Sequence, residues 1–269
     1  MEPRLTLGLI AGSGVYPLLL AQAARAAGVQ QIYAAAFVGE TDPSLSSLVT
    51  GIEWMRVGQL NRLLGFFRNA GLENAIMAGQ IAPKNLFDLR PDWKALLLLA
   101  RLKRRNAETI FAAIAAELRA IGVELLPAVT YLERSLASPG LIAGPKLSRR
   151  QNEDVIFGWQ IAKEMARLDI GQTVVVKNGT VLAVEAFDGT NETVKRGGAL
   201  ARKDALMIKV AKPDQDMRFD VPVIGLETLQ TAVAAGVRVI AIEAGRTLLL
   251  EKESLLDAAT RANVSIVAL

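Results

Sequence analysis

The sequence predicts an α/β protein of two domains, with a parallel sheet in the first and a mixed sheet in the second. Short apolar runs alternate with helical segments through the first half, and several of these helices end at a glycine that a β-type run follows at once. This order is typical of βαβ units. The second half carries Asn178-Gly179 between two β-type runs, which is a strong signal for a two-residue hairpin. A length of 269 residues accommodates two domains of ordinary size.

The elements of the N-terminal domain follow one another from Leu5 to about Val129. Strands are expected at residues 6–12, 31–39, 73–79 and 123–129, and helices at 17–28, 60–71, 93–105 and 107–121. The following stretch is rich in Ser, Gly, Pro and charge, which is typical of a boundary. We therefore expect an N-terminal domain at 1–134, a linker at 135–154 and a C-terminal domain at 155–269.

The C-terminal domain continues from the hairpin into a helix that begins at about Thr190. Strands are expected at 206–211, 237–245, 246–251 and 264–269, and helices at 227–236 and 253–263. Together with the hairpin, these elements predict a mixed sheet with helices. No apolar stretch approaches the roughly 20 residues of a membrane-spanning helix, so we expect a soluble, cytoplasmic protein.

The composition removes several classes of chemistry. The chain contains no cysteine and no histidine. Ser-His and Cys-His mechanisms are thereby excluded, as are thiolate and imidazole metal sites. Carboxylates, hydroxyls, lysine, arginine, backbone amides and a hard cation such as magnesium remain. The balance of 31 basic and 27 acidic residues suits an anionic ligand, but a net charge of +4 is too small to indicate nucleic acid.

The turn Gly12-Ser13-Gly14 follows the first expected strand and precedes a helix. Backbone amides at such a point can bind a phosphate, so these three residues are candidate nucleotide contacts. The dinucleotide fingerprint places a third glycine where this chain has Pro17, so it is incomplete here. A tight turn without any ligand is the alternative.

Two carboxylates and a hydroxyl gather where the hairpin leads into the next helix. Glu185 and Asp188 are followed by Gly189 and Thr190. This combination makes Gly189 and Thr190 candidate substrate contacts. A helix cap formed by Thr190 is the structural alternative, although it does not explain Glu185.

The run KVAKPDQDMRFDVPVIG, residues 209–225, carries charges of both signs between two apolar segments. A lysine within a strand is costly unless it is paired or faces a cleft. Cations can hold phosphate oxygens while carboxylates hold a divalent ion or orient water, so phosphoryl chemistry needs both. A salt-bridged surface loop is the alternative, but the absence of histidine and cysteine favours function. The candidates are Lys209, Lys212, Gln215, Arg218 and Asp220.

The expected helix at 93–105 combines an aliphatic face with a basic end. Such a helix could lie against acyl chains or an anionic membrane surface. An ordinary core helix with basic residues placed favourably for its dipole is the alternative. The charged residues of the preceding loop, Lys84, Asp88 and Arg90, are interpreted as solvated.

Several motifs in order resemble the LpxI family of UDP-2,3-diacylglucosamine pyrophosphatases. They are IAGSGVYP, NLFDLRPD, VLAVEAFDGT, KVAKPDQDMRFDVPVIG and VIAIEAGRTLLLE. The resemblance implies a Rossmann-like N-terminal domain, a linker and a separate α/β catalytic domain, with the ligand held between the domains and a homodimer as the assembly. It also implies an enzyme of lipid A biosynthesis that acts at the cytoplasmic side of the inner membrane.

The implied reaction uses a divalent cation, Mg²⁺ or another such as Mn²⁺, and water attacking the α-phosphorus. The products are UMP and 2,3-diacylglucosamine 1-phosphate, lipid X. By motif match the essential acid is Asp220, to which we assign metal binding or water activation. Lys209, Lys212 and Arg218 are assigned to the pyrophosphate. Asn191 stands where the family pattern commonly has an acid. A nicotinamide-dependent oxidoreductase and a non-catalytic nucleotide-sugar-binding protein are the competing hypotheses.

Overall fold

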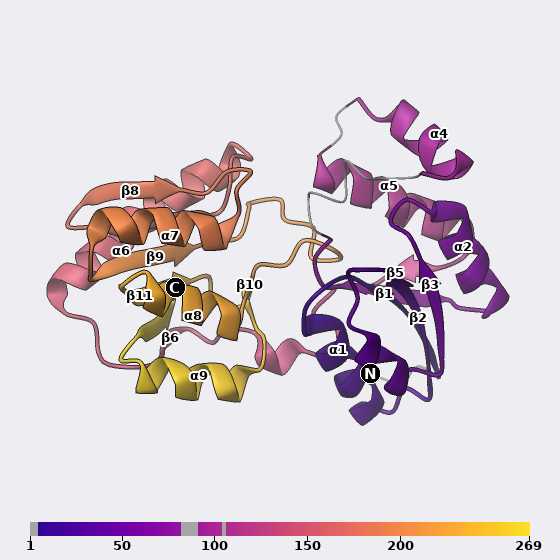
Figure 1. Ribbon diagram of the computed structural model, residues 1–269, viewed down its shortest axis with the longest axis horizontal. Coiled ribbons are helices and arrows are strands. Elements are labelled where there is room, and N and C mark those ends of the chain that lie inside the picture. Colours follow the sequence, from indigo (N-terminus) through magenta and orange to yellow (C-terminus); the bar gives the residue numbers. More distant parts are fainter. Residues whose placement is uncertain (1–4, 82–90, 104–105) are drawn as a thin grey trace. The chain divides into compact units, whose positions relative to one another are not determined.

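The computed structural model describes residues 5–81, 91–103 and 106–269 (Figure 1). The chain forms two compact units. Unit 1 comprises Met1–Glu133 together with Asp216–Asp220, and unit 2 comprises Arg134–Gln215 together with Val221–Leu269. Lys84, Asp88 and Arg90, the motif residues 85–90, and the two arginines at 104–105 lie outside the described residues.

Unit 1 is built on a five-stranded, fully parallel sheet, which confirms the predicted parallel arrangement. The strand order is β3-β2-β1-β4-β5. The strands are β1 (Thr6–Ala11), β2 (Gln31–Phe37), β3 (Gly51–Met55), β4 (Asn74–Ala78) and β5 (Glu124–Leu125). Strand β3 is not among the predicted strands; its residues are mostly half-buried because it lies at the sheet edge. The strand expected at 123–129 is limited to the two residues of β5, and its continuation forms loop structure.

The helices of unit 1 bury aliphatic and aromatic side chains against the sheet. They are α1 (Tyr16–Ala26), α2 (Leu60–Asn69), α4 (Trp93–Arg101) and α5 (Ala107–Ala120), with a 3₁₀ helix at Pro43–Ser47. Phe67 of α2 and Leu118 of α5 are fully buried in one core cluster with Met77 of β4. This burial is the main source of stability for the unit, at roughly 25 cal/mol per Å² of apolar surface.

A short piece of the later chain completes unit 1. The ring of Phe219 lies 5.7 Å from that of Phe111 on α5, measured between centroids. The backbone carbonyl of Met217 accepts a 2.7 Å hydrogen bond from the amide of Ala128. Residues 216–220 of the charged run are therefore packed into this unit rather than into the unit that precedes and follows them in sequence.

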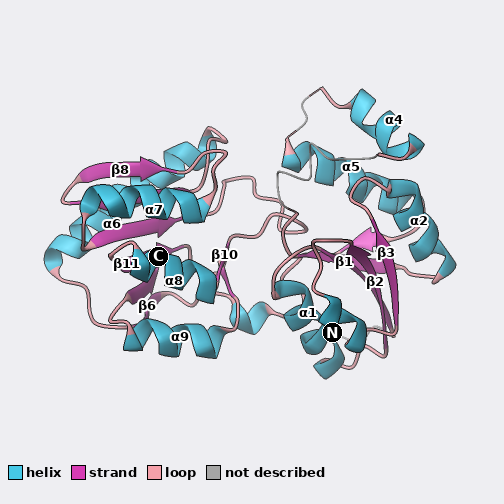
Figure 2. Cartoon of the chain, in the orientation of Figure 1, coloured by secondary structure: helices cyan, strands magenta, loops and turns pink. Residues whose placement is uncertain are grey.

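Unit 2 contains the predicted mixed sheet, in the order β6-β13-β11-β9-β7-β8. Figure 2 draws its strands in magenta and labels β6, β8 and β11. Strands β9, β11 and β13 are parallel to one another, whereas β6, β7 and β8 pair antiparallel. The strands are β6 (Gly140–Ala143), β7 (Thr173–Lys177), β8 (Thr180–Val184), β9 (Ala205–Lys209), β11 (Val237–Ile242) and β13 (Ser265–Ala268). A separate two-stranded sheet pairs β10 (Val223–Ile224) with β12 (Leu248–Leu249), so the strand expected at 246–251 is shorter than predicted.

Helices pack on both faces of this sheet, because successive strand residues point to opposite sides. Helix α6 (Arg149–Arg167) shares one core cluster with Val174 and Ile208. Residues Val175 and Met207 belong to the other cluster, with α7 (Thr190–Ala201), α8 (Leu226–Ala234) and α9 (Lys252–Arg261).

The predicted hairpin is confirmed. Asn178 and Gly179 have φ angles of 53° and 71°, as a type I′ turn requires, and they connect the antiparallel strands β7 and β8. The side chain of Asp154 on α6, which is 5% exposed, accepts hydrogen bonds from both turn amides, at 2.8 and 2.7 Å. These two hydrogen bonds fix the turn to helix α6.

Residues 135–154, which the sequence analysis assigns to a linker, contain β6 and the start of α6. Ser148 begins α6 with a capping box in which Gln151 is the partner. This Ser-x-x-Gln spacing is the sequence signal that could have placed the helix start. Among the described residues, no helix combines the length and apolar character needed to cross a membrane.

Candidate functional site

The turn after β1 is joined to the end of β4. The amides of Gly12 and Ser13 donate to the carbonyls of Ala78 and Gln80, at 2.8 and 2.7 Å, and the Ser13 hydroxyl also donates to Gln80, at 2.6 Å. A Cβ atom on Gly12 would lie 2.7 Å from the Gln80 carbonyl oxygen. Two amides of the turn that was predicted to bind phosphate therefore already donate to backbone carbonyls at the end of β4.

Gly14 has a different environment. It is exposed, has a φ of +83° and lines a cavity of about 730 Å³ together with Gly39, Thr41 and Trp54. These residues follow β1 and β2 or lie in β3. Ligands collect at the carboxyl edge of strands in open α/β sheets, and this cavity lies at that edge.

A chain of hydrogen bonds connects three of the polar residues in unit 2. The Nζ atom of Lys209, at the end of β9, donates to the hydroxyl oxygen of Thr190, at 2.7 Å. That hydroxyl in turn donates to Oε1 of Glu185, at 2.8 Å. Lys209 and Glu185 are both only 8% exposed. The hydroxyl thus links a buried cation to a buried carboxylate, which offsets the cost of burying either charge.

Thr190 does not cap α7, contrary to the alternative considered from the sequence. It is the first helical residue, and Gly189, with a φ of 82°, is the N-cap. The remaining carboxylate oxygen of Glu185 accepts the amide of Gln172, at 3.2 Å. Glu185 follows β8 directly, and its burial is explained by these two bonds.

Asp188 forms an ion pair with Arg196 of α7, at 2.7 Å. Partial burial acts to raise the pKa of Asp188, but the amide of Ala186 and the guanidinium of Arg196 outweigh it and lower that pKa. The carboxylate therefore stays ionised and braces the start of α7.

The start of the charged run is held by polar side chains of unit 2. The amide of Lys212 donates to Oε1 of Gln215, at 2.6 Å, and the ammonium of Lys212 binds the carboxylate of Asp169. Gln215 is 8% exposed, and its Nε2 atom has no hydrogen-bond partner among the described residues.

Residues 216–220 of the run, which belong to unit 1, contain a two-point ion pair. The Nε and Nη2 atoms of Arg218 donate to the two carboxylate oxygens of Asp216, at 2.9 and 2.6 Å. The hydrogen bond from Arg218 lowers the pKa of Asp216, and the same contact raises the pKa of Arg218. Asp220 is half-buried, and its amide donates to the carbonyl of Asp216, at 2.9 Å.

Sequence reasoning missed Glu243 and Lys163. Glu243 follows β11, and its carboxylate accepts the amide of Ala211, at 2.8 Å, and the ammonium of Lys163, at 3.0 Å. The same ammonium donates to the carbonyl of Ala211, at 3.2 Å. The pair thus fixes the backbone where the charged run leaves β9. A carboxylate directly after the apolar run VIAI was the signal in the sequence.

The structure brings Lys209, Thr190 and Glu185 together, and separately Lys212 with Gln215 and Arg218 with Asp216. Lys209 and Lys212 belong to unit 2, whereas Arg218 and Asp220 belong to unit 1. In the described parts of the chain, no three carboxylate side chains are grouped so that they alone could hold a metal ion.

Comparison with known proteins decides the family. Residues 6–135 match the family model of the LpxI N-terminal domain, and residues 138–267 match that of the LpxI C-terminal domain. The chain belongs to the LpxI family. A relative, the UDP-2,3-diacylglucosamine pyrophosphatase LpxI of Caulobacter vibrioides, is 30% identical over 264 residues, covering 94% of this chain and 93% of the relative. The resemblance noted from the LpxI motifs is thereby confirmed.

Two solved structures share only low similarity with this LpxI family member. The biotin carboxylase domain of the Hydrogenobacter thermophilus 2-oxoglutarate carboxylase matches at 11% identity with a TM-score of 0.28, covering 75% of this chain and 42% of that one. The protein gox2253 matches at 13% identity with a TM-score of 0.27, covering 96% and 86%. Similarities at this level carry no argument about function.

Proposed function

We propose that the protein hydrolyses UDP-2,3-diacylglucosamine. Water attacks the α-phosphorus and the bond between that phosphorus and the bridging oxygen breaks. UMP forms, and 2,3-diacylglucosamine 1-phosphate leaves with the bonding electrons. The observation that carries the proposal is the similarity to the Caulobacter vibrioides pyrophosphatase along 94% of the chain. The lack of histidine and cysteine agrees with a reaction run by oxygen ligands and cationic side chains.

The cations of unit 2 are assigned to the phosphates. Lys209 is held at the end of β9 by Thr190, which sits at the N-terminus of α7 beside Gly189. A helix N-terminus and an ammonium group both favour an anion. Lys212 is assigned to the same substrate group, and Gln215 orients the backbone that carries it.

Asp220 is assigned to the metal ion and the attacking water. Mg²⁺ takes oxygen ligands and is often bound through one or two carboxylates and substrate phosphates, so a single carboxylate at the motif position fits this role. The ion, Mg²⁺ or Mn²⁺, would neutralise the charge that develops on the phosphates. For Arg218 we assign the Nη1 atom to substrate, since Asp216 binds Nε and Nη2.

Of the three candidate nucleotide contacts in the turn at 12–14, we assign only Gly14 to the ligand. The amides of Gly12 and Ser13 already donate to backbone carbonyls, whereas Gly14 borders the cavity at the carboxyl edge of the sheet. We assign this cavity to the nucleotide. Homodimeric assembly and a cytoplasmic location belong to the same proposal, and light scattering of the purified protein tests the first.

The decisive experiment incubates the protein with detergent-dispersed UDP-2,3-diacylglucosamine and measures UMP by chromatography. We expect UMP with Mg²⁺ or Mn²⁺ and none with chelator. Asp220→Asn should lower the rate by about a thousandfold, an effect typical of losing one charge-stabilising group. Asp257→Asn, at an exposed position of α9, is the matched control and should retain full activity.

Two outcomes would point to the competing hypotheses. Binding of the UDP-sugar without UMP from the wild-type protein would indicate a non-catalytic nucleotide-sugar-binding protein. A thermal shift with NAD(H), together with no UMP, would indicate an oxidoreductase. Either result would overturn the proposal.

A further inference from the structure

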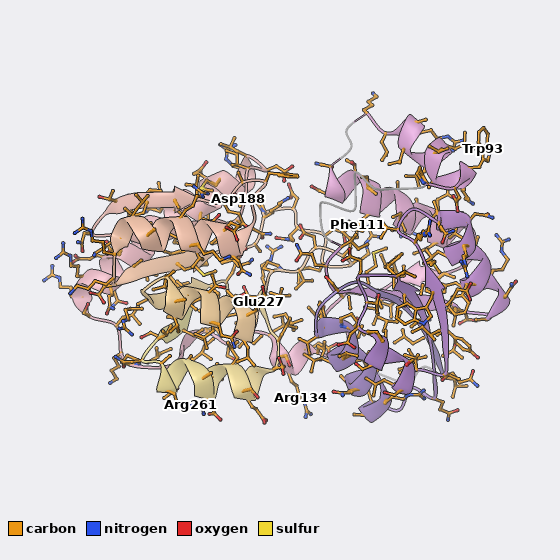
Figure 3. The ribbon with its side chains drawn as sticks, in the orientation of Figure 1. Trp93, Phe111, Arg134, Asp188, Glu227 and Arg261 are labelled. Atoms are coloured by element: carbon orange, nitrogen blue, oxygen red, sulfur yellow. The ribbon has the colours of Figure 1, made fainter. Side chains whose placement is uncertain are left out.

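Helix α4 carries an apolar stripe on the outside of unit 1. Trp93 is 74% exposed, Leu96 48% and Leu97 40%, and Ala100 is also exposed. These positions are spaced i, i+3, i+4 and i+7, so they lie on one face of the helix. Figure 3 shows the ring of Trp93 projecting from the α4 ribbon. A continuous exposed stripe of this kind is unusual for a helix that faces only water.

The stripe is not the result of a poorly packed helix. Ala95 and Leu98, on the opposite face, are buried in the core cluster of unit 1. The carboxylate of Asp92 accepts the amide of Ala95, at 2.9 Å, and that of Asn61 at the start of α2, at 2.7 Å, so one side chain caps two helices. The helix is therefore fixed, with its apolar stripe turned outward.

The charged residues of the segment 93–103 itself are all basic, although Asp92 precedes it and Glu117 of α5 lies beside it. Residues 93–103 contain Lys94, Arg101 and Lys103 and no Asp or Glu. Arg101 and Lys103 are exposed, whereas Lys94 forms an ion pair with Glu117 of α5, at 2.8 Å. Aromatic and leucine side chains on one face, followed by exposed basic residues, are typical of a helix that lies in the interface of an anionic membrane.

A cavity of about 820 Å³ adjoins the stripe and has the same mixed chemistry. Trp93, Leu97 and Leu98 contribute its apolar wall, while Arg62 and Arg101 contribute guanidinium groups. Two carboxylates also line the cavity, but Asp92 accepts the amides of two helices and Glu117 is paired with Lys94. A phospholipid presents hydrocarbon and phosphate side by side, so it complements both parts. A second copy of the chain fits less well. The stripe of four residues is far smaller than the roughly 20 to 30 residues that each partner contributes to a stable interface.

We propose that α4 docks the protein on the surface of a membrane containing anionic phospholipid, with Trp93, Leu96 and Leu97 inserted among the acyl chains and Arg101 and Lys103 at the headgroups. The inference goes beyond the proposed hydrolysis, because it concerns a lipid surface rather than the bond that is broken. It can therefore be tested without substrate.

The test is co-sedimentation of the intact protein with vesicles of phosphatidylcholine alone and of phosphatidylcholine and phosphatidylglycerol in equal parts. We expect the wild type to bind the anionic vesicles, and added salt to weaken this binding. The double variant Leu96→Gln with Leu97→Gln should partition about tenfold more weakly. Leu200→Gln, at an exposed leucine of α7, should bind as the wild type does.

A second pair of variants tests the charge. Arg101→Gln with Lys103→Gln should weaken binding to anionic vesicles by about tenfold. Arg261→Gln, in the last turn of α9, is the matched control. Wild-type protein left in the supernatant with anionic vesicles, or double variants that bind as well as wild type, would overturn the proposal. A change of molecular mass in light scattering for the leucine variant, without a change in vesicle binding, would instead identify a contact between copies.

Discussion

The ammonium of Lys209 and the hydroxyl of Thr190 lie 2.7 Å apart, which joins the last residue of β9 to the first residue of α7. The hydroxyl in turn donates a hydrogen bond to Oε1 of Glu185, at 2.8 Å. These two hydrogen bonds form a series in which the cation donates to the hydroxyl and the hydroxyl donates to the carboxylate. Each bond polarises and strengthens the next. The Lys209 side chain is therefore held in one position by the hydroxyl of Thr190.

Removing the Thr190 hydroxyl should disturb both stability and activity. Thr190→Val leaves two buried charges without their shared partner, so we expect a loss of about 1 to 3 kcal/mol in the free energy of unfolding. Thr190→Ser retains the hydroxyl and should recover most of the loss. Urea denaturation and UMP formation measure the two effects, with Thr180→Val on the exposed part of β8 as control. Equal stability of the Val and Ser variants would contradict the role of the hydroxyl.

Gly79→Ala should destabilise unit 1 strongly. Gly79 has a φ of +89°, and a Cβ atom there would lie 2.6 Å from the carbonyl oxygen of Ser13. Gly71 also has a positive φ, +64°, but a Cβ atom added there would meet no other atom within 4 Å. Gly71→Ala should therefore lower the free energy of unfolding by about 1 to 2 kcal/mol, from backbone strain alone. Gly79→Ala should lower it distinctly more. Thermal unfolding of the two variants measures both losses of stability. Similar losses for Gly79→Ala and Gly71→Ala would argue against the close backbone contact.

Asp154→Ala should loosen the β7–β8 hairpin. The substitution leaves the amides of Asn178 and Gly179 without the carboxylate that both now bind. We expect a loss of about 1 to 3 kcal/mol in the free energy of unfolding and faster hydrogen exchange at these two amides. Glu153→Ala, at the exposed neighbouring position, is the control. Unchanged exchange at the turn would show that the hairpin does not depend on α6.

The Asp216–Arg218 pair should make unit 1 sensitive to acid. Because the folded-state pKa of Asp216 is lowered, its stabilising contribution is present above the unfolded pKa of about 3.9 and is lost as the pH falls through the folded pKa. A pair this exposed contributes at most about 1 kcal/mol. Arg218→Gln should return the pKa of Asp216 toward its ordinary value in a carboxyl NMR titration. Arg238→Gln, which removes a looser exposed pair with Asp204 of unit 2, should leave that titration unchanged.

Much of the fold could be predicted from local patterns, and the failures have physical causes. Helices such as α2 and α5 were found because their apolar spacing and terminal signals are local. β3 was missed because an edge strand needs less apolar burial, and α6 because it begins within a polar segment. The candidate residues of the run from Lys209 to Asp220 were found from charge, whereas Glu243 was missed because its role is to hold another segment.

The sequence by itself determined the alternation of strands and helices, the hairpin turn, the exclusion of imidazole and thiol chemistry, and the motifs that indicate the family. These depend on residue identity and short spacing, which the chain displays directly. Only the tertiary structure decided that the Thr190 hydroxyl binds Lys209 and Glu185, that Arg218 holds Asp216, and that residues 216–220 pack into unit 1. Such contacts depend on which partners the folded backbone brings within hydrogen-bonding distance, and partners far apart in sequence leave no local pattern.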